Sequence, residues 1–496
     1  MKVHFIGIGG IGVSALARYY LEKGHKVSGS DLVSSEITDA LKEKGAKIFI
    51  GHNPKCLTPG VKQVIYSPAI QKNNPELKKA YKLQTTRLPA PRAQASDGQA
   101  NYKLQIMSYP EALGELTKKY FTIAVCGSHG KSTVSAMIGL ILTKAKLDPT
   151  VILGTKLKEF APHQKNGGGS NCRVGKGKYL VIEADEYKES FLNYWPRIIV
   201  LTTLEPDHLD YYKNFKNYIS AFKKFISHLP KNGYLIANKD DKNIYPTFST
   251  IVENMGHYSL RQKEAKKIKK ILKVPGKHNV QNALAALAVA RALSVPDEIS
   301  FKALSEYKGS WRRFEVIEAD KRGYLRGFTP KITLISDYAH HPTQIKATLE
   351  AAKERFSDKK IWVVFQPHQY QRTYYLFKDF VKVLSEAPID KLIITDIYEV
   401  AGRENKKIKK KVSSEKLVKR IMNYELEIRN KIMYIPTIEK AVDYLKKNLK
   451  GEEVVIVMGA GDVYKLADLL IDPVRNMPRT SFYMNSIPKC NILIFY

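Results

Sequence analysis

The sequence predicts an α/β protein of three domains. Three observations lead to this prediction. The chain has 496 residues, enough for about three domains of ~150 residues each. Short apolar runs alternate with helix-like stretches along most of the chain, a pattern typical of parallel sheets covered by helices. A glycine-rich turn joins an apolar run to a helix-like stretch at two places, residues 7–12 and 127–130.

The first segment opens with a strand in KVHFIGIGG and a helix in GVSALARYYLEKG. Gly7, Gly9 and Gly12 form G-x-G-x-x-G between them, and Asp31 ends the next strand. This fingerprint provides a tight turn, a close backbone approach to a diphosphate and an acid for a ribose hydroxyl, and taken alone it predicts an NAD site. Strands at AKIFI and QVIYSPAI follow. Residues 84–106, rich in Gln, Ala, Pro and Thr, are predicted to be a loop or insertion near a domain boundary.

The second glycine-rich turn lies in VCGSHGKSTVSAMIGLI, residues 125–141, between a predicted buried strand and a predicted helix. Gly127 and Gly130 allow N–H groups to turn inward as an anion cradle, and the helix N-terminus adds partial positive charge. Lys131 can reach terminal phosphate oxygens, and the Ser132 hydroxyl can ligate Mg²⁺. The spacing G-x-x-G-K-S-T is shorter than that of the usual phosphate loop, and a turn without a ligand is the alternative. The strand–turn–helix context favours nucleotide phosphate.

Carboxylates follow the next two apolar strands of the middle segment. They are Glu183, Asp185 and Glu186 after YLVI, and Glu205, Asp207 and Asp210, with His208, after IIVLTT. Ligands bind at the carboxyl ends of parallel strands, and Mg²⁺ takes one or two carboxylates plus phosphate oxygens. Either cluster alone is equally consistent with a surface strand end. Because both clusters follow strands downstream of a phosphate loop, they favour a site that uses a metal ion and acts on phosphate.

The last segment continues the alternation, with strands in ITLISDYAHHP, KIWVVFQPHQ, KLIITDIYE and EVVIVMGAGD. Asp337, His340 and His341 follow the first of these strands, which favours a functional over a structural role. Arg312 and Arg313, just before it, can clamp a phosphoryl group because a guanidinium matches phosphate geometry. Upstream, His278, Asn279 and Asn282 open a helix, and asparagine there pairs with an adenine edge or simply begins the helix.

Composition adds few constraints on function. The net charge of +33 is compatible with nucleic acid, anionic lipid or an anionic small substrate. The Lys-rich stretches 261–273 and 406–420 have helical spacing, so we predict exposed helix faces there and no nucleic-acid partner. No run of ~18 apolar residues occurs, so no membrane span is expected, and no N-terminal signal pattern is recognised.

The four cysteines form no CxxC pair, which fits a reduced cytoplasmic location and argues against a structural zinc site. They are Cys56, Cys126, Cys172 and Cys490.

The ordered motifs resemble those of the Mur ligase family, whose members add amino acids to the peptidoglycan precursor. The matching stretches are HFIGIGGIGVSALA, GSD, GSHGKST, EADE…SFL, EPDHLDYY, GKHNVQNALAA, RRFE, DYAHHPTQI, FQPHQYQRT and MGAGD. They occur in family order over residues 4–462. They are most similar to those of the members that add L-alanine to UDP-N-acetylmuramate.

The resemblance implies three domains. Residues 1–118 would be a Rossmann-like domain that binds the UDP part of the substrate, so the first glycine motif would face UDP and not NAD. Residues 119–309 would bind ATP on a P-loop ATPase-type parallel or mixed sheet. Residues 310–471 would be a second Rossmann-like domain on the amino-acid side, and residues 472–496 match nothing in the family.

The resemblance also implies the reaction. ATP would phosphorylate the lactyl carboxylate of UDP-N-acetylmuramate, and the amine of L-alanine would attack the acyl phosphate. ATP and Mg²⁺ are the implied cofactors, the sugar nucleotide, L-alanine and ATP are the implied partners, and we expect a monomer or homodimer.

Residue by residue, the resemblance implies four sets of functional residues. The catalytic set is Lys131, His208, Arg313 and His341. The ATP-binding set is Gly127, Ser128, His129, Gly130, Lys131, Ser132, Thr133, Asn279, Asn282, Arg313 and Asp337. The substrate-binding set is Gly9, Gly10, Ile11, Gly12, Asp31, Ser67, Asn171, Arg173, His341, His368 and Arg372. The metal ligands would be Ser132 and Glu183 for one Mg²⁺ and His208 for a second.

Some residues depart from the family pattern. Ser128 and Ser132 stand where Thr is usual, Thr203 where Asn is common, and Gln369 where many relatives have Arg. Thr203 therefore puts a polar contact near the metals in question, and Gln369 puts amino-acid affinity or choice in question.

Three alternatives stay open. A related ligase that attaches a recycled peptide to UDP-N-acetylmuramate shares the fold, although FQPHQYQRT favours the alanine enzyme. A basic nucleic-acid-binding ATPase would explain the charge but leaves the first glycine motif and the histidine clusters unexplained. A non-catalytic sensor of UDP-sugar would not need Lys131, Glu183 and His208.

Overall fold

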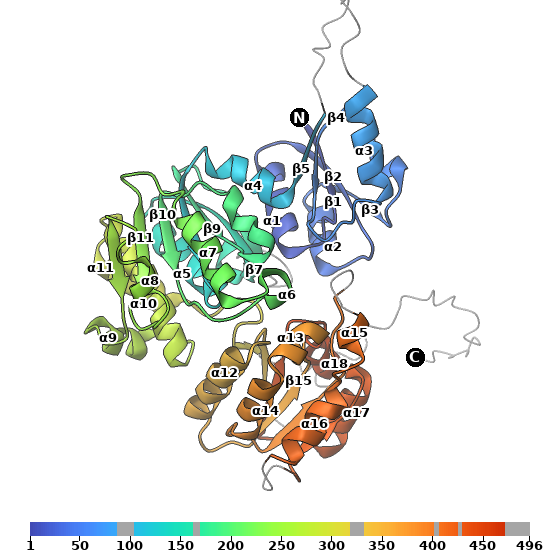
Figure 1. Ribbon diagram of the computed structural model, residues 1–496, viewed down its shortest axis with the longest axis vertical. Helices are drawn as coiled ribbons and strands as arrows, with labels where there is room; N and C mark the ends of the chain where they lie inside the picture. The colour runs from blue at the N-terminus through green and yellow to red at the C-terminus, as the bar shows by residue number, and fades with distance from the viewer. Residues whose placement is uncertain (87–103, 162–168, 318–331, 401–405, 425–428, 472–496) are drawn as a thin grey trace, which may run out of the picture.

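Three separate sheets form the framework of the chain. The computed structural model describes residues 1–86, 104–161, 169–317, 332–400, 406–424 and 429–471. Within these residues, strands from 2–108, 121–258 and 315–458 form three sheets with helices packed on them (Figure 1). The predicted three-domain α/β architecture is confirmed. The domain limits at 118, 309 and 471 stay predictions, and the tail 472–496 lies outside the described residues.

The first sheet is parallel and has the order β3-β2-β1-β4-β5. Its strands are β1 Lys2–Ile6, β2 Lys26–Asp31, β3 Lys47–Ile50, β4 Val61–Tyr66 and β5 Gln105–Ser108. Its helices are α1 Ile11–Glu22, α2 Glu36–Glu43, α3 Pro75–Thr86 and α4 Tyr109–Thr117, with the 3-10 turn η1 Pro54–Cys56. The strand order reverses at β1, so the glycine motif after β1 lies at the point where such sheets bind ligands. The predicted loop at 84–106 overlaps α3 and β5 at its ends, and its residues 87–103 lie outside the described part of the chain.

The central sheet has the order β12-β11-β10-β6-β9-β7-β8. Its strands are β6 Phe121–Cys126, β7 Thr150–Leu157, β8 Ser170–Arg173, β9 Tyr179–Glu183, β10 Ile198–Leu201, β11 Tyr234–Asn238 and β12 Met255–Tyr258. Its helices are α5 Lys131–Lys144, α6 Leu209–Tyr212, α7 Phe215–Ile226, α8 Tyr245–Phe248, α9 Glu264–Ile271, α10 Lys277–Ala292 and α11 Asp297–Glu306, with η2 Lys158–Phe160 and η3 Tyr187–Asn193. The register pairs Val125 with Glu183 and Cys126 with Leu201. The phosphate-loop sequence and both acidic clusters therefore begin at the carboxyl ends of three neighbouring strands, β10, β6 and β9.

The third sheet has the order β13-β14-β18-β15-β16-β17. Its strands are β13 Glu315–Ile317, β14 Thr333–Asp337, β15 Ile361–Phe365, β16 Lys391–Ile394, β17 Ile432–Tyr434 and β18 Val454–Met458. Its helices are α12 Pro342–Arg355, α13 Tyr370–Tyr375, α14 Phe377–Ser385, α15 Lys406–Lys409, α16 Ser414–Met422, α17 Ile438–Asn448 and α18 Lys465–Ile471.

Two edge pairs are antiparallel, β7 with β8 and β13 with β14. The alternation pattern alone predicted parallel pairing, and these two edge pairs differ from that prediction. A parallel pair needs a crossover, usually helical, whereas an antiparallel pair does not.

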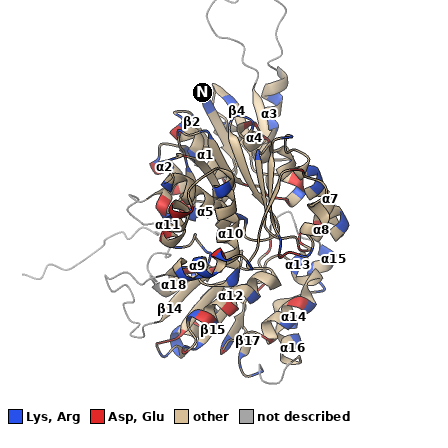
Figure 2. Cartoon of the chain, turned by 90° about the vertical axis from the view of Figure 1, so that its left-hand side faces the viewer, with Lys and Arg blue, Asp and Glu red and all other residues tan. Residues whose placement is uncertain are grey.

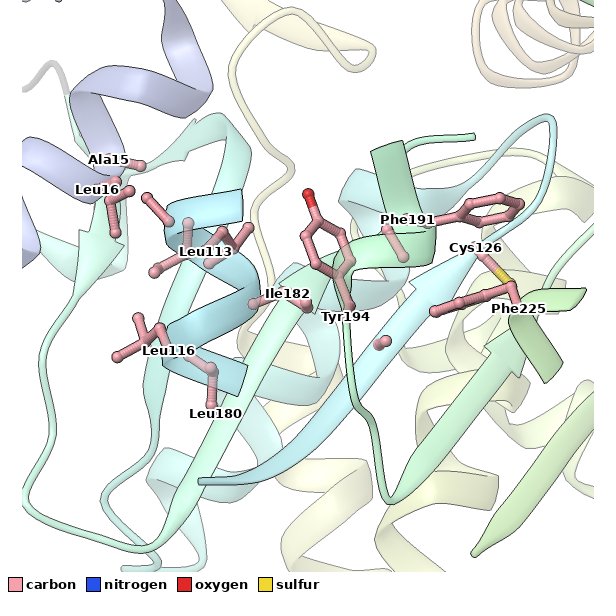
Figure 3. Packing of buried hydrophobic residues seen from close by; sticks show 14 of the residues in the cluster. Ala15, Leu16, Leu113, Leu116, Cys126, Leu180, Ile182, Phe191, Tyr194 and Phe225 are labelled. Atoms are coloured by element: carbon pink, nitrogen blue, oxygen red, sulfur yellow. The ribbon is translucent and has the colours of Figure 1, made fainter. Parts of the chain in front are cut away.

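The first and central sheets share one hydrophobic core. Helix α4 lies between them, and its Leu113 and Leu116 face Leu16 of α1 and Leu180 of β9 (Figure 3). Helix α1 also packs on β7 and β8. Because this shared core is apolar, we expect these two domains to stay together as one unit. The third domain has core clusters of its own.

Basic residues are dispersed over the outer faces of the helices, with acidic residues among them (Figure 2). In α9 the lysines are exposed while Ala265 and Ile268 are buried, and α16 likewise buries Leu417, Val418 and Ile421. The prediction of exposed faces at both Lys-rich stretches is confirmed for the described residues. Among those residues, no helix has both the length and the apolar character needed to cross a membrane.

Candidate active site

The turn between β6 and α5 has a backbone that requires glycine. Gly127 has φ +125° and Gly130 has φ +85°. A Cβ atom on Gly127 would lie 2.3 Å from the Thr202 hydroxyl, and one on Gly130 would lie 2.5 Å from Oδ1 of Asn282. The loop is therefore folded tightly against the neighbouring strand and α10. Such a turn at a helix N-terminus presents N–H groups to an anion.

Lys131 is held at this turn by its own loop and by a buried acid. Its Nζ donates to the carbonyl oxygen of Gly127 at 2.6 Å and to Glu186 at 2.9 and 3.1 Å. Burial acts to lower the pKa of Lys131, but the carboxylates of Glu186 and Asp185 outweigh it and the pKa is raised. Lys131 is therefore a cation inside the site, and a phosphate that enters must compete with Glu186 for it.

Ser132 and the first acidic cluster form an oxygen-rich group beside the lysine. The Ser132 hydroxyl donates to Oε2 of Glu183 at 2.7 Å. Burial raises the pKa of Glu183, although hydrogen bonds from Ser132 and the Gly154 N–H oppose the shift. Asp185, Glu186 and His208 offer ligand atoms within 4.8 Å of one another. Hydroxyl and carboxylate oxygens are the donors that Mg²⁺ prefers, and a cation here would compensate the carboxylates, of which Glu186 is buried, so the residues fit Mg²⁺.

The second acidic cluster joins the central and third domains. Asp207 accepts from Nη2 of Arg372, on α13, at 3.0 Å, and both side chains are buried. Burial opposes ionisation of Asp207, but Arg372 and then His208 hold its pKa well below the usual range. His208 itself has φ +53° at the start of α6. The acidic motif thus fixes the third domain beside the phosphate loop.

A cavity of about 270 Å³ lies between the phosphate loop, the start of α10 and the start of the third domain. Burial lowers the pKa of His278 in its wall to about 4, so this imidazole is neutral. Asp337 accepts from the N–H groups of Phe314 and Ala339, each at 2.7 Å, and burial raises its pKa. The predicted ATP-binding residues in this lining are His129, Gly130, Ser132, Thr133, Asn279, Asn282, Arg313 and Asp337.

A second cavity of about 260 Å³ adjoins the first. The two share five lining residues, namely His129, Gly130, Ser132, Arg313 and Gln344. The second is lined by charged and polar groups, including Lys131, Glu183, Asp185, Glu186, Asp207, His208, His340, His368 and Arg372. The second cavity thus combines cationic and acidic groups beside the phosphate-loop sequence, an arrangement suited to phosphoryl transfer.

Three domain models of one protein family match consecutive segments of the chain. They are the Mur ligase family catalytic domain over residues 2–96, the Mur ligase middle domain over 125–290, and the Mur ligase glutamate ligase domain over 312–461. The chain belongs to the Mur ligase family. The resemblance read from the motifs is confirmed.

Relatives of known name narrow the comparison within the Mur ligases. A UDP-N-acetylmuramate–L-alanine ligase of Acetivibrio thermocellus is 38% identical over 494 residues, covering 95% of each chain. The crystal structure of a UDP-N-acetylmuramate-alanine ligase from Thermotoga maritima is 26% identical, with a TM-score of 0.73, and the match covers 95% of this chain and 98% of that one. A murein peptide ligase from Psychrobacter arcticus is 22% identical with a TM-score of 0.63, covering 95% of this chain and 98% of that one, and this likeness shows the fold alone.

In this Mur ligase the first glycine motif is hydrogen-bonded to Asp31, the acid that follows it in the fingerprint. The N–H of Gly9 donates to Oδ2 of Asp31 at 2.8 Å, and a Cβ on Gly9 would lie 2.9 Å from the same oxygen. A Cβ on Gly12 would meet the Tyr109 hydroxyl at 2.9 Å. Gly10 precedes α1 as its N-cap, and Ser67 follows β4 with its N–H donating to the Ile6 carbonyl. The motif is thus packed as the fingerprint requires, at the crevice of the first sheet.

Asn171 and Arg173 of β8 make hydrogen bonds to different parts of the protein. Asn171 Nδ2 donates to the Ile11 carbonyl at 2.6 Å and to the Ser14 hydroxyl at 2.8 Å, which ties the central domain to the start of α1. Arg173 donates to the carbonyl of Pro149 and to Asp148, each at 2.6 Å. Their roles in substrate binding stay predictions.

His340 and His368 of the third domain lie together, with ring centroids 5.6 Å apart, whereas His341 lies elsewhere. His340 lines the second cavity, and burial holds its pKa well below the usual range. His341 instead caps α12 and faces His129, with ring centroids 4.8 Å apart, and the described linings of the two cavities do not include it. His368 stacks on Tyr398 and lies 3.3 Å from Arg372. His341 stays a predicted catalytic and substrate-binding residue, and His340 is a wall residue to which the sequence analysis gave no separate role.

Three residues that depart from the family pattern have defined surroundings in the structure. The Thr203 hydroxyl accepts from the His129 N–H at 2.9 Å, so a polar contact to the phosphate loop is present. The Ser128 hydroxyl lies 2.9 Å from that of Tyr218 and donates to the Glu205 carbonyl at 3.0 Å. Gln369 is buried at the N-cap of α13 with φ +69° and lines the second cavity.

Proposed function

We propose that this protein is an ATP-dependent ligase that joins L-alanine to the lactyl carboxylate of UDP-N-acetylmuramate. The observation that carries the proposal is the combination of family and near relatives. All three Mur ligase pieces occur in order, and relatives named UDP-N-acetylmuramate–L-alanine ligase match at 38% identity over 95% of the chain. The paired cavities described above supply a site of the required chemistry.

The reaction balances in two steps. A carboxylate oxygen of the substrate attacks the γ-phosphorus of ATP, the bond to the bridging oxygen breaks and ADP leaves. The free amine of L-alanine then attacks the carbonyl carbon of the acyl phosphate, phosphate leaves with the former carboxylate oxygen, and the amine loses a proton to solvent. Phosphorylation is needed because a carboxylate is a poor acylating agent and phosphate is a good leaving group.

The residues of the second cavity would offset the charge of two approaching anions. Lys131 and Arg313 would contact the transferring phosphoryl group, where fixed cations stabilise the transition state. Mg²⁺, held by Ser132 and Glu183 with His208 at a second site, would supply further positive charge on the phosphate oxygens. Arg372 and His368 would lie on the alanine side, and Asn279 and Asn282 on the adenine side.

The first domain would hold the UDP part through the glycine loop and Asp31. For this to happen, the Asp31 carboxylate must either accept from the ribose hydroxyl as well as from the Gly9 N–H, or release the Gly9 N–H. Asn171 would then link sugar-nucleotide binding to the central domain. We expect a monomer or homodimer in the cytoplasm that needs no nucleic acid.

Phosphate release by the purified protein tests the proposal. The reaction contains ATP, Mg²⁺ and UDP-N-acetylmuramate, with each amino acid or a murein tripeptide added singly. Release that requires both the sugar nucleotide and L-alanine supports the proposal. Release with the tripeptide but not with alanine would replace it by the peptide-recycling ligase, and binding of the sugar nucleotide without turnover would replace it by a sensor.

A further inference from the structure

Two consecutive arginines in the link between the central and third domains point to different partners. Arg313 lies 3.4 Å from the Ser132 hydroxyl at the phosphate loop and lines both cavities. Arg312 instead reaches into the third domain and is only 5% exposed. It donates to the carbonyl of Gly459, and to that of Gly461 at 3.0 Å. The proposed reaction gives Arg313 a role and leaves Arg312 without one.

Aromatic rings surround the Arg312 guanidinium. Its central carbon lies 4.6 Å from the Tyr464 ring centroid, 5.0 Å from that of Tyr338 and 5.6 Å from that of Trp311. The Arg313 guanidinium lies 4.7 Å from the same Tyr338 ring. Both cations therefore contact one aromatic side chain, which fixes them relative to each other by cation–π attraction.

The loop that receives Arg312 is fixed in turn. Gly459 has φ +150°, and a Cβ there would lie 2.7 Å from the Gln366 carbonyl. A Cβ on Gly461 would lie 2.3 Å from Oε1 of Gln366 and 2.5 Å from Tyr398. Tyr398 stacks on His368, a wall residue of the second cavity. The loop that binds Arg312 is thus continuous with the His368 wall of the second cavity.

The backbone around Arg313 is held in a conformation that L-residues seldom adopt. Arg312 has φ +57° and Phe314 has φ +49°. The Arg312 carbonyl accepts from the Tyr338 N–H at 2.8 Å, and the Arg313 N–H donates to Ser310 at 3.0 Å. Such backbone persists only when surrounding contacts enforce it, and the buried Arg312 side chain supplies several of them.

We propose that Arg312 is a positioning residue for the phosphoryl-contacting Arg313. It ties the link between domains to the loop 459–461, so that Arg313 reaches the phosphate loop only when the third domain is seated. The inference rests on the proposed ligase function for its catalytic consequence, while its effect on nucleotide binding is independent of that function.

A double-mutant cycle tests this role. The variants are Arg312→Lys, Arg313→Lys and the pair of them, because lysine keeps the charge but lacks the planar guanidinium that lies against the three rings and whose Nη2 donates to both carbonyl groups. We expect Arg312→Lys to raise the Kd for ATP and lower kcat by about 10- to 100-fold, since small misplacements near the chemistry have effects of this size. The KM for the sugar nucleotide should stay within about twofold, because the first-domain loop is untouched, and the double variant should be no worse than the larger single effect.

Arg18→Lys is the matched control. Arg18 is equally buried, at 4% exposed, but lies on α1 in the first domain. It should leave the Kd for ATP unchanged. If Arg312→Lys does not fold, Tyr464→Leu removes one ring from the Arg312 anchor and should produce a smaller loss of the same kind.

Three results would overturn the proposal. One is a double variant whose loss equals the product of the two single losses, which would make the arginines independent. The others are an equal loss in Arg18→Lys and an unchanged Tyr464→Leu variant. If the wild-type protein bound ATP but formed no alanyl product, the proposed function would fail, while the cycle on the Kd for ATP would still decide the role of Arg312.

Discussion

Replacing Gly130 by alanine should separate the conformational requirement of the phosphate loop from its contact with α10. The left-handed backbone at φ +85° costs an L-residue about 1–2 kcal/mol. The added Cβ would lie 2.5 Å from Oδ1 of Asn282, so this side chain must retreat by about 1 Å to reach ordinary contact. Loss of one hydrogen bond to the adenine side is worth about 0.5–1.5 kcal/mol, which corresponds to a rise of up to about tenfold in the Kd for ATP.

Gly24→Ala is the matched control for this prediction. Gly24 has φ +78°, and a Cβ there would have no atom within 4 Å. Both variants should lose about 1–2 kcal/mol of unfolding free energy in urea, and only Gly130→Ala should bind ATP more weakly in isothermal titration calorimetry. An unchanged Kd for ATP in Gly130→Ala, with the stability loss present, would show that Asn282 does not contact the nucleotide beside Gly130.

The remaining predictions concern the charges of the site. Lys131→Met should lower phosphate release by about 10²–10³-fold, as loss of a fixed transition-state donor does. It should also reduce stability, because Glu186 is left buried without its cation. Retained turnover would contradict the proposed role of Lys131. Removing divalent cations with EDTA should abolish phosphate release and added Mg²⁺ should restore it, and turnover in EDTA would exclude the metal role of Glu183. Burial opposes ionisation of Glu205, but hydrogen bonding to His129 dominates and its pKa falls to about 2. Since the unfolded value is about 4.3, this group contributes stability above that pH and loses it as pH falls from about 4.3 towards 2. Urea denaturation against pH should show this loss in the wild type, and Glu205→Gln should flatten that part of the profile; an identical slope in both proteins would count against it.

Much of the fold could be predicted from local pattern. The strands β6, β9 and β10 are runs of mostly buried apolar residues, and helices such as α7 bury one face at helical spacing, so the element types and the three-domain α/β class followed. The antiparallel pairs and the shared core of the first two domains did not. Both depend on contacts between distant segments, such as α4 against β9, that have no signature in the spacing of residues.

The site was predictable where a motif requires a particular backbone. Gly127, Gly130 and Lys131 are examples, since positive φ values and a helix start leave a sequence signature. The pairing of Asp207 with Arg372 was not predictable from sequence spacing, because the partners are 165 positions apart and belong to different domains. Similarly, Gln344 contacts His129 at 2.9 Å across the same seam, and its only sequence signal is its position just after DYAHHPT.

In the proposed reaction, a carboxylate oxygen of UDP-N-acetylmuramate passes to phosphate as the amide bond forms. The most direct measurement uses the sugar nucleotide labelled with ¹⁸O in its lactyl carboxylate, with ATP, Mg²⁺ and L-alanine. The proposed reaction predicts one ¹⁸O atom in the released phosphate and a product heavier than the sugar nucleotide by one alanyl residue, both read by mass spectrometry. Phosphate without the label, or label in the phosphate without an alanyl product, would contradict the account.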